Sequence, residues 1–266
     1  MLRARLATAA VAIPLLLLLI LYPATSTPVA ILVFAVGVIG IAEYASLAFA
    51  AQRAEWVLTV LLGTMTLAAA VFKADHWLSA ALTLAISAAL VWVLFTRPDF
   101  EQGLRDIGLA FVGILYISIL LPHFVWLRDQ SPLGPRWVVL VLAIGMAGDA
   151  GGYFVGKALG RHKLSPHVSP GKTIEGALGI VAASLLIASI YKLLFLHEVG
   201  MQEILYLSLV MSVLGQLGDL SESVMKRAFG AKESGWIFPG HGGVLDRIDS
   251  LLFPVAFLYY HLVFLR

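Results

Sequence analysis

Long apolar runs, separated by short polar stretches, occupy most of the chain. A helix needs about 20 consecutive, mostly apolar residues to cross a membrane. Nine runs meet this requirement, at approximately residues 5–22, 28–50, 56–72, 77–96, 106–127, 137–156, 174–196, 204–223 and 250–265. Because backbone polar groups in lipid must be satisfied within the segment, these runs are expected to be helices. The pattern predicts an all-α, polytopic integral membrane protein with about nine transmembrane helices.

Composition agrees with lipid as the solvent of this chain. Of the 266 residues, 60% are hydrophobic and 13% are charged, whereas soluble domains carry about 25% charged residues. The net charge of +2 comes without a long basic run, so nucleic acid is not expected as a partner. The sequence has no cysteine, which excludes disulfides, thiol nucleophiles and cysteine-ligated zinc. The charge-free run over residues 6–42 is too long for the apolar core of a signal peptide and is interpreted as retained helices.

Lysine and arginine predict the orientation, because they collect in the cytoplasmic loops of membrane proteins. With nine helices, thirteen of these residues fall on one side and five on the other. The richer side is expected to be cytoplasmic, with the N-terminus inside and the C-terminus outside the cell inner membrane. Two long loops on that side, residues 157–173 and 224–249, are dense in glycine, proline and charge. Long loops tend to carry function, so the active site is expected to face the cytoplasm.

Polar residues are unevenly distributed between the two halves of the chain. Residues 1–145 are expected to form a membrane scaffold of transmembrane helices, with oligomer or lipid contacts. Residues 146–266 hold both long loops and are expected to form the catalytic region. A homodimer is compatible with this division, although no residue of the sequence identifies an interface.

The polar residues of the eighth run share one face of the expected helix. Ser212, Gln216, Asp219, Ser223 and Lys226 are spaced four, three, four and three residues apart, which confines them to a stripe about 80° wide. For Ser212 and Gln216, a polar seam between packed helices is the simpler interpretation. A carboxylate within a membrane helix is costly unless it is paired, wet or bound to a cation. Asp219, with Ser223 and Lys226 beside it, is therefore interpreted as functional.

The loop that follows combines glycines with carboxylates. Gly242 and Gly243 follow His241, a substrate contact at most, and consecutive glycines let backbone N–H groups converge on an anion. Asp246 and Asp249 are three residues apart and face one point if a helix has begun. Considered alone, Asp249 would be an acidic helix start. Together with the aspartate of the eighth helix, these carboxylates predict a site for Mg²⁺, which takes one or two carboxylates plus phosphate oxygens and water.

A second polar region lies before the seventh helix. The orientation signal alone explains most of its basic residues, but not the crowding of polar residues at the helix entry. Thr173 is expected to cap this helix, Lys172 to contact phosphate, and Glu175 to pair with Lys172. Asp149 lies nearby, at the cytoplasmic end of the sixth helix. Together these features predict metal-assisted phosphate chemistry on a lipid-borne substrate.

A 27-residue stretch with fixed gaps carries the most specific pattern of the chain. It reads Ser223-Val224-Met225-Lys226-Arg227, then Lys232-Glu233 after four residues, then Pro239-Gly240-His241-Gly242-Gly243-Val244-Leu245-Asp246-Arg247-Ile248-Asp249. This stretch closely resembles the signature of the phosphatidate cytidylyltransferases, or CDP-diacylglycerol synthases. The similarity extends to Leu164-Ser165-Pro166, Ser169-Pro170, Lys172-Thr173, Glu175-Gly176 and Gly218-Asp219-Leu220. Two departures are Glu233, where the family usually has Asp, and Gly171, where a Lys is common.

The resemblance implies an enzyme that transfers CMP from CTP to phosphatidic acid, giving CDP-diacylglycerol and pyrophosphate for phospholipid synthesis. It implies Mg²⁺ as the cofactor, held by Asp219 and Asp246. The residues expected to be catalytic are Asp219, Asp246, Lys226 and Arg247. The residues expected to bind substrate are Lys172, Ser223, Arg227, Lys232, His241, Gly242, Gly243 and Asp249.

Two other functions stay open at this point. A CTP-dependent lipid kinase of the polyprenol or phytol type would also need membrane spans, a metal and basic loops, but it would pass on the γ-phosphoryl group. An ion-coupled transporter would use Asp219 and Glu222 as its coupling site. Transporters often show inverted repeats and broken helices, and the sequence shows neither.

Overall fold

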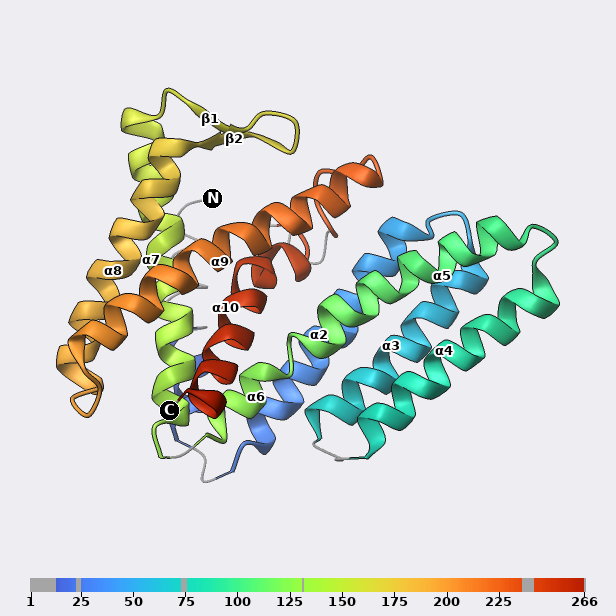
Figure 1. The fold of residues 1–266 in the computed structure, drawn as a ribbon, viewed down its shortest axis with the longest axis horizontal. Helices are drawn as coiled ribbons and strands as arrows, with labels where there is room; N and C mark the ends of the chain where they lie inside the picture. Colours follow the sequence, from blue (N-terminus) through green and yellow to red (C-terminus); the bar gives the residue numbers. More distant parts are fainter. Residues whose placement is uncertain (1–12, 23–24, 73–75, 131, 236–241, 266) are drawn as a thin grey trace.

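The computed structural model describes residues 13–22, 25–72, 76–130, 132–235 and 242–265, and this part of the chain is mostly helical (Figure 1). The helices are α2 (Thr27–Ala48), α3 (Arg53–Val71), α4 (Trp77–Thr96), α5 (Phe100–Ile114), the π-helix η1 (Leu115–Ile119), α6 (His123–Arg128), α7 (Gly134–Leu159), α8 (Ile174–Phe195), α9 (Met201–Ala228) and α10 (Leu245–Phe264). Residues 13–21 are also helical and precede α2. Two short strands, β1 (Lys163–Ser165) and β2 (Ser169–Thr173), form an antiparallel hairpin between α7 and α8.

Eight segments of the described chain are long and apolar enough to cross a membrane. One of them, Phe100–Arg128, joins α5, η1 and α6, and each of the others is a single helix. The predicted all-α, multi-pass architecture is confirmed. The first predicted span, residues 5–22, lies partly outside the described residues. The orientation of the termini and the division at residue 145 stay predictions.

Several predicted boundaries were wrong. α9 continues to Ala228 and α10 begins at Leu245, so the loop predicted over residues 224–249 is shorter than expected. α7 likewise continues to Leu159, and part of the predicted loop 157–173 folds as the hairpin. The physical reason is that a helix needs apolar residues only within the hydrocarbon core. Apolar runs therefore mark the lipid-spanning part of each helix and miss its polar ends.

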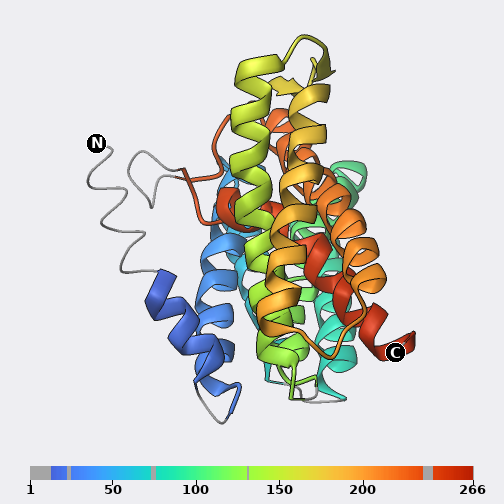
Figure 2. The ribbon, with the colours of Figure 1, turned by 90° about the vertical axis from the view of Figure 1, so that its left-hand side faces the viewer.

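The helices form two groups (Figure 1). α7 to α10 stand together on one side and α3 to α5 on the other, with α2 and α6 between them. In the view turned by 90°, most of the long helices run in roughly the same direction, as expected for membrane spans (Figure 2). The hairpin, the last turns of α9 and the first turns of α10 lie toward the same end of the molecule.

α7 and α8 pack closely because glycines lie along their contact. A Cβ on Gly152 of α7 would meet the side chain of Ile180, and a Cβ on Gly179 of α8 would meet Val155. Small residues let the backbones of membrane helices approach one another. The two helices consequently form one wall of the cavity described below.

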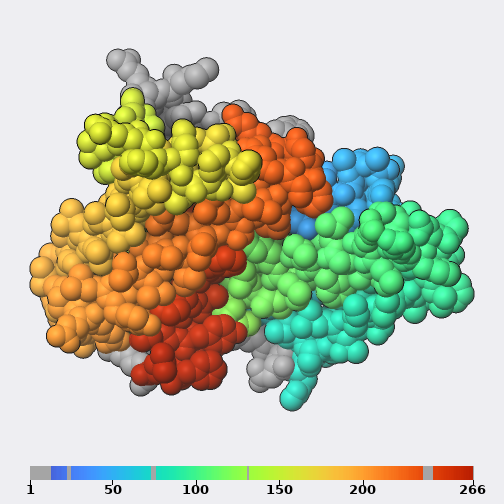
Figure 3. All heavy atoms as spheres, turned by 45° about the horizontal axis from the view of Figure 1, so that its top comes forward, coloured from blue at the N-terminus to red at the C-terminus, as the bar shows by residue number. Residues whose placement is uncertain are grey.

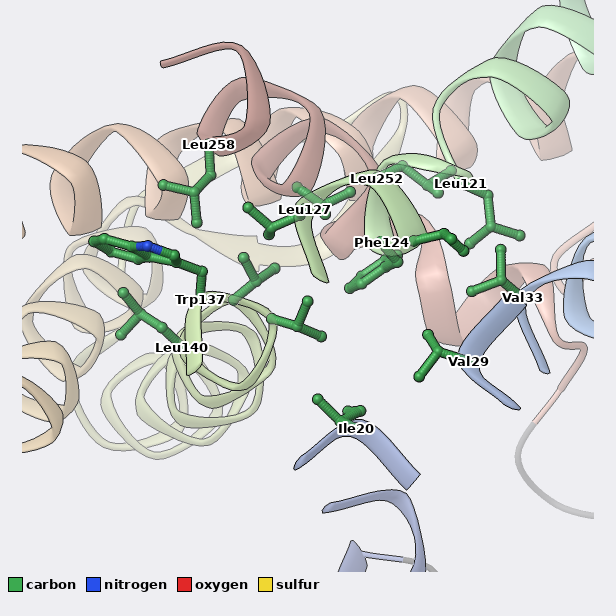
Figure 4. Close-up of a cluster of buried hydrophobic side chains, with 14 of the residues drawn as sticks. Ile20, Val29, Val33, Leu121, Phe124, Leu127, Trp137, Leu140, Leu252 and Leu258 are labelled. Carbon is green, nitrogen blue, oxygen red and sulfur yellow. The ribbon is translucent and has the colours of Figure 1, made fainter. Parts of the chain in front are cut away.

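The largest apolar cluster lies where the two groups of helices meet (Figure 4). It joins side chains from α2, α6, α7 and α10, among them Val33, Phe124, Trp137, Leu140 and Leu252. Within a membrane, such packing stabilises through close van der Waals contact rather than exclusion of water. Through this cluster α10, the last helix, is held close to α2, which lies near the start of the sequence.

Candidate functional site

A cavity of about 640 Å³ lies at the end of the molecule that carries the hairpin. Its walls come from α7, the hairpin, α8, α9 and α10. Pockets for small molecules typically measure about 300–1,000 Å³. The charged side chains that line it are Asp149, Lys157, Lys172, Asp219, Lys226, Asp246, Arg247 and Asp249. Four carboxylates and four basic groups from the described chain therefore share one space.

Asp219 lies on the α9 wall, and about a third of its side chain is exposed. Its Oδ2 is 2.5 Å from Nζ of Lys172 in β2, and its Oδ1 accepts a hydrogen bond from Ser223 Oγ at 3.5 Å. Lys172 reaches Asp219 because the hairpin lies over the end of α9 (Figure 3). Arg227 fixes this arrangement, since its Nε donates to the Val168 carbonyl in the hairpin turn at 3.2 Å.

Asp246, the second expected metal ligand, is held more tightly. Its Oδ1 accepts a hydrogen bond from Lys226 Nζ at 2.5 Å, and Lys226 also pairs with Glu222, which is fully buried. Its Oδ2 accepts three hydrogen bonds, from Ser234 N at 2.9 Å, Ser234 Oγ at 2.9 Å and Gly243 N at 2.8 Å. Such bonds offset part of the cost of removing a carboxylate from water. Glu222, Lys226 and Asp246 are called the Lys226 cluster below.

The first turns of α10 carry two more of the predicted residues into the cavity. Arg247 and Asp249 both line it, and Asp249 is only 7% exposed. Gly242 and Gly243, which precede α10, contact Asp246 rather than lining the cavity. Gly242 has a φ of 77°, a conformation that favours glycine. The two glycines thus shape the surroundings of Asp246.

Arg227, Lys232 and His241 were also expected to contact substrate. Arg227 and Lys232 are not among the lining residues of the cavity. Arg227 instead donates from Nη1 to the Ala231 carbonyl at 2.8 Å, besides its bond to the hairpin. Lys232 is exposed, and His241 lies outside the described residues. Their roles toward substrate stay predictions.

The start of α8 confirms one expectation and corrects another. Thr173 caps the helix, because its Oγ1 accepts a hydrogen bond from Gly176 N at 3.1 Å. Glu175 was expected to pair with Lys172, and this was wrong. Glu175 pairs with His162 at 2.6 Å, because Lys172 points from β2 toward the carboxylate on α9.

The polar seam expected on α9 holds for one of its two members. Gln216 Nε2 donates across to the Ala177 carbonyl of α8 at 3.5 Å. Ser212 is buried but bonds within its own helix, to the Leu209 carbonyl at 2.8 Å. Gln216 and Ala177 both line the cavity, so this bond joins its α9 and α8 walls.

Sequence reasoning missed Glu43, which lies on α2 in the half of the chain that was expected to be a scaffold. This side chain is 6% exposed and accepts hydrogen bonds from Val244 N and Leu245 N, both at 2.9 Å. A lone carboxylate in an apolar span was the signal that could have found it. Ser234, a partner of both Glu43 and Asp246, carried no such signal.

Tyr153 was also missed. It lines the cavity from α7, is 61% exposed, and its ring centroid is 5.6 Å from Lys157 Nζ. An exposed tyrosine beside a lysine is typical of the boundary between membrane and water. The lining of the cavity thus includes a pair of residues of the kind that this boundary favours.

The cavity offers oxygen donors suited to Mg²⁺. No group of three or more His, Asp or Glu residues in the described ranges is arranged to hold a metal by itself. Mg²⁺ usually keeps several waters and needs only one or two protein carboxylates beside substrate phosphates. Asp219 and Asp246 both line the cavity, although each is paired with a different lysine. This donor set is compatible with the cation, and Asp219 is the more accessible of the two.

Comparison with known proteins shows which family the sequence resembles. A sequence model described as "Cytidylyltransferase family" matches residues 3–265. A phosphatidate cytidylyltransferase of Bacillus subtilis is 37% identical over 176 residues, which cover 66% of this chain and 65% of that protein. One from Brucella suis is 40% identical over 171 residues, covering 63% and 60%, and one from Staphylococcus epidermidis is 38% identical over 153 residues, covering 58% of each.

The aligned stretches thus span less than two thirds of the length of these relatives. The family match, by contrast, extends over nearly all of the chain, including the helices on both sides of the cavity. The chain belongs to the cytidylyltransferase family.

Proposed function

We propose that this protein is a phosphatidate cytidylyltransferase, which transfers CMP from CTP to phosphatidic acid and releases pyrophosphate. The observation that carries the proposal is the cavity in which Asp219, Lys172, Lys226 and Asp246 meet at the ends of membrane-spanning helices. The three relatives named above bear the name of this activity. A lipid substrate and a soluble nucleotide can both reach a site at this level.

The reaction joins two polyanions, so positioning and charge neutralisation carry most of the catalysis. An oxygen of the lipid phosphate attacks the α-phosphorus of CTP, a new P–O bond forms, and the bond to pyrophosphate breaks. The lipid phosphate is already a nucleophile, so no serine or histidine base is required. Lys157 and Arg247 line the cavity without belonging to the Lys226 cluster, and they are assigned to neutralise phosphates.

Asp219 and Asp246 are assigned as the residues that hold Mg²⁺. The bound cation would supply charge neutralisation for the phosphate oxygens. Lys172 pairs with Asp219 across the cavity, and it is placed to exchange this carboxylate for a substrate phosphate. Lys226 stays with Glu222 and keeps the buried side of the cluster close to neutral.

The site is assigned to the cytoplasmic face of the cell inner membrane. The excess of lysine and arginine in the loops at this end supports that orientation, and it gives the site access to cytosolic CTP. A homodimer is retained as the proposed assembly. The mass of the detergent-solubilised particle measures this directly.

Labelled CTP tests the reaction. With purified protein and phosphatidic acid, α-³²P-labelled CTP is expected to label the lipid product, and γ-³²P-labelled CTP is expected to label only pyrophosphate. Lipid label from the γ position alone would contradict cytidylyl transfer and favour a CTP-dependent lipid kinase. No label in lipid from either nucleotide, with ion-driven uptake into proteoliposomes, would favour the transporter.

The metal assignment predicts that chelation stops the reaction. EDTA in excess is expected to abolish CMP transfer, because the phosphates of both substrates then lack a cation to neutralise them. Added Mg²⁺ should restore the rate in the same sample, which shows that the protein survived the treatment. Full activity in EDTA would remove Mg²⁺ from the proposal while leaving the substrates in place.

A further inference from the structure

The side chain of Glu43, on α2, hydrogen-bonds to the backbone at the start of α10. Its Oε1 accepts a hydrogen bond from Val244 N, and its Oε2 accepts one from Leu245 N, each at 2.9 Å. Ser234 Oγ lies 3.3 Å from Oε2. The carboxylate therefore binds backbone that is 201 residues away in the sequence, at the start of α10.

These contacts complete the start of α10. The first N–H groups of a helix have no partner within the helix and need other acceptors. Val244, at the N-cap, provides no side-chain cap, and Glu43 supplies the missing acceptor from α2. A negative charge at a helix N-terminus is also favoured by the helix dipole. These N–H groups also offset part of the cost of burying the Glu43 carboxylate.

The same carboxylate is linked to Asp246. Ser234 Oγ, which contacts Glu43, donates to Asp246 Oδ2 at 2.9 Å. Gly243 N donates to the same oxygen at 2.8 Å. A Cβ on Gly235 or Gly243 would strike the Glu43 carboxylate, so both backbones approach it as closely as glycine allows. Ser234, which precedes residues 236–241, and Val244, which follows them, thus both contact the Glu43 side chain.

We propose that Glu43 is a positioning residue for the reaction. It anchors the N-terminus of α10 to α2, and α10 in turn directs Asp246 and Arg247 into the cavity. Glu43 does not line the cavity itself, so it acts through these residues and not on substrate. The catalytic part of this inference rests on the proposed function, whereas the link between α2 and α10 does not.

Glu43→Gln tests the catalytic part. The amide keeps the shape of the side chain but turns one acceptor into a donor that faces a backbone N–H. We expect kcat for CMP transfer to fall by about 10- to 100-fold, with KM for CTP changed less than about threefold, because misplacement of reacting groups mainly affects the transition state. A loss of thermal stability with kcat unchanged would assign Glu43 a purely structural role and overturn the proposal.

Glu55→Gln is the matched control. Glu55 is also a largely buried carboxylate at a helix end, where it pairs with Arg97, and it does not line the cavity. The change is expected to lower stability and leave kcat per folded molecule unaltered. An equal fall in kcat for both variants would show that any buried carboxylate has this effect, and would also overturn the proposal.

A labelling experiment tests the link without relying on the reaction. The chain has no cysteine, so Val244→Cys introduces a single thiol at a position that is 5% exposed. Adding Glu43→Gln to this variant should raise its rate of maleimide labelling at least about tenfold. Equal labelling rates would overturn the link. Faster labelling of the double variant, together with no CMP transfer by the unaltered protein, would support the link and contradict the proposed function alone.

Discussion

Asp246→Asn is expected to lower the rate of CMP transfer by about 10³-fold. Oδ1 of Asp246 binds Lys226, and Oδ2 accepts hydrogen bonds from Ser234 and Gly243. An amide in this place must turn its NH₂ group toward one of these donors, and it removes the charge proposed to bind Mg²⁺. Asp219→Asn is expected to cause a similar loss from the more exposed side of the cavity, because it removes the other carboxylate proposed to hold Mg²⁺.

The measurement is the initial rate per folded molecule in lipid nanodiscs, after size-exclusion chromatography has confirmed insertion. Asp99→Asn is the control, since Asp99 caps α5 by accepting a bond from Gln102 N at 3.1 Å. Asparagine is an equally good N-cap, so this variant should keep the full rate. Near-normal rates for both Asp219→Asn and Asp246→Asn would eliminate the proposed metal site.

Lys226→Met is expected to destabilise the protein by about 3–5 kcal/mol and to abolish activity. The change leaves Glu222 and Asp246 as neighbouring buried carboxylates without a cation, and breaking a buried ion pair on one side has a cost of this order. Glu222 is fully buried, and Lys226 is the ion-pair partner that the structure gives it. The free energy of unfolding can be measured by titration with SDS in mixed micelles.

The double variant Glu222→Gln/Lys226→Met separates charge from packing. It removes one of the two unpaired carboxylates, so it should recover part of the lost stability without recovering activity. An unfolding free energy of Lys226→Met equal to that of the unaltered protein would contradict the Lys226 cluster as a buried ionic unit.

Membrane spans were the most predictable part of the fold. Lipid imposes a minimum length on every span. The predicted bounds of α4 and α8 therefore agree with the observed ones to within one residue. α9 runs past its apolar stretch to Ala228 because its last turns lie outside this constraint. The β1–β2 hairpin could not be predicted, since its strands are three and five residues long, too short to show an alternating pattern.

The part of the site that could be predicted consists of residues on a single helix, α9. Helical spacing placed Ser223 and Lys226 on the face of Asp219, and the structure brings Ser223 to that side chain. The pairing of Lys172 with Asp219 depends on how the hairpin folds over α9, which no local pattern encodes. Glu43 was missed for a related reason. The predicted division into scaffold and catalytic region rests on the density of polar residues, and the contacts of Glu43 cross that division.

The charges of the cavity have a consequence for how substrates are admitted. Aspartates and basic residues are equal in number among its described lining, and Lys172 and Lys226 are each already engaged by an aspartate. Lys226 is also shared with the buried Glu222, so the cavity has no surplus of positive charge that would attract a bare triphosphate. A nucleotide that arrives with a bound divalent cation brings less negative charge into the cavity than a naked one. The cavity should therefore bind a cation-bound nucleotide in preference to a free one, before any chemical step.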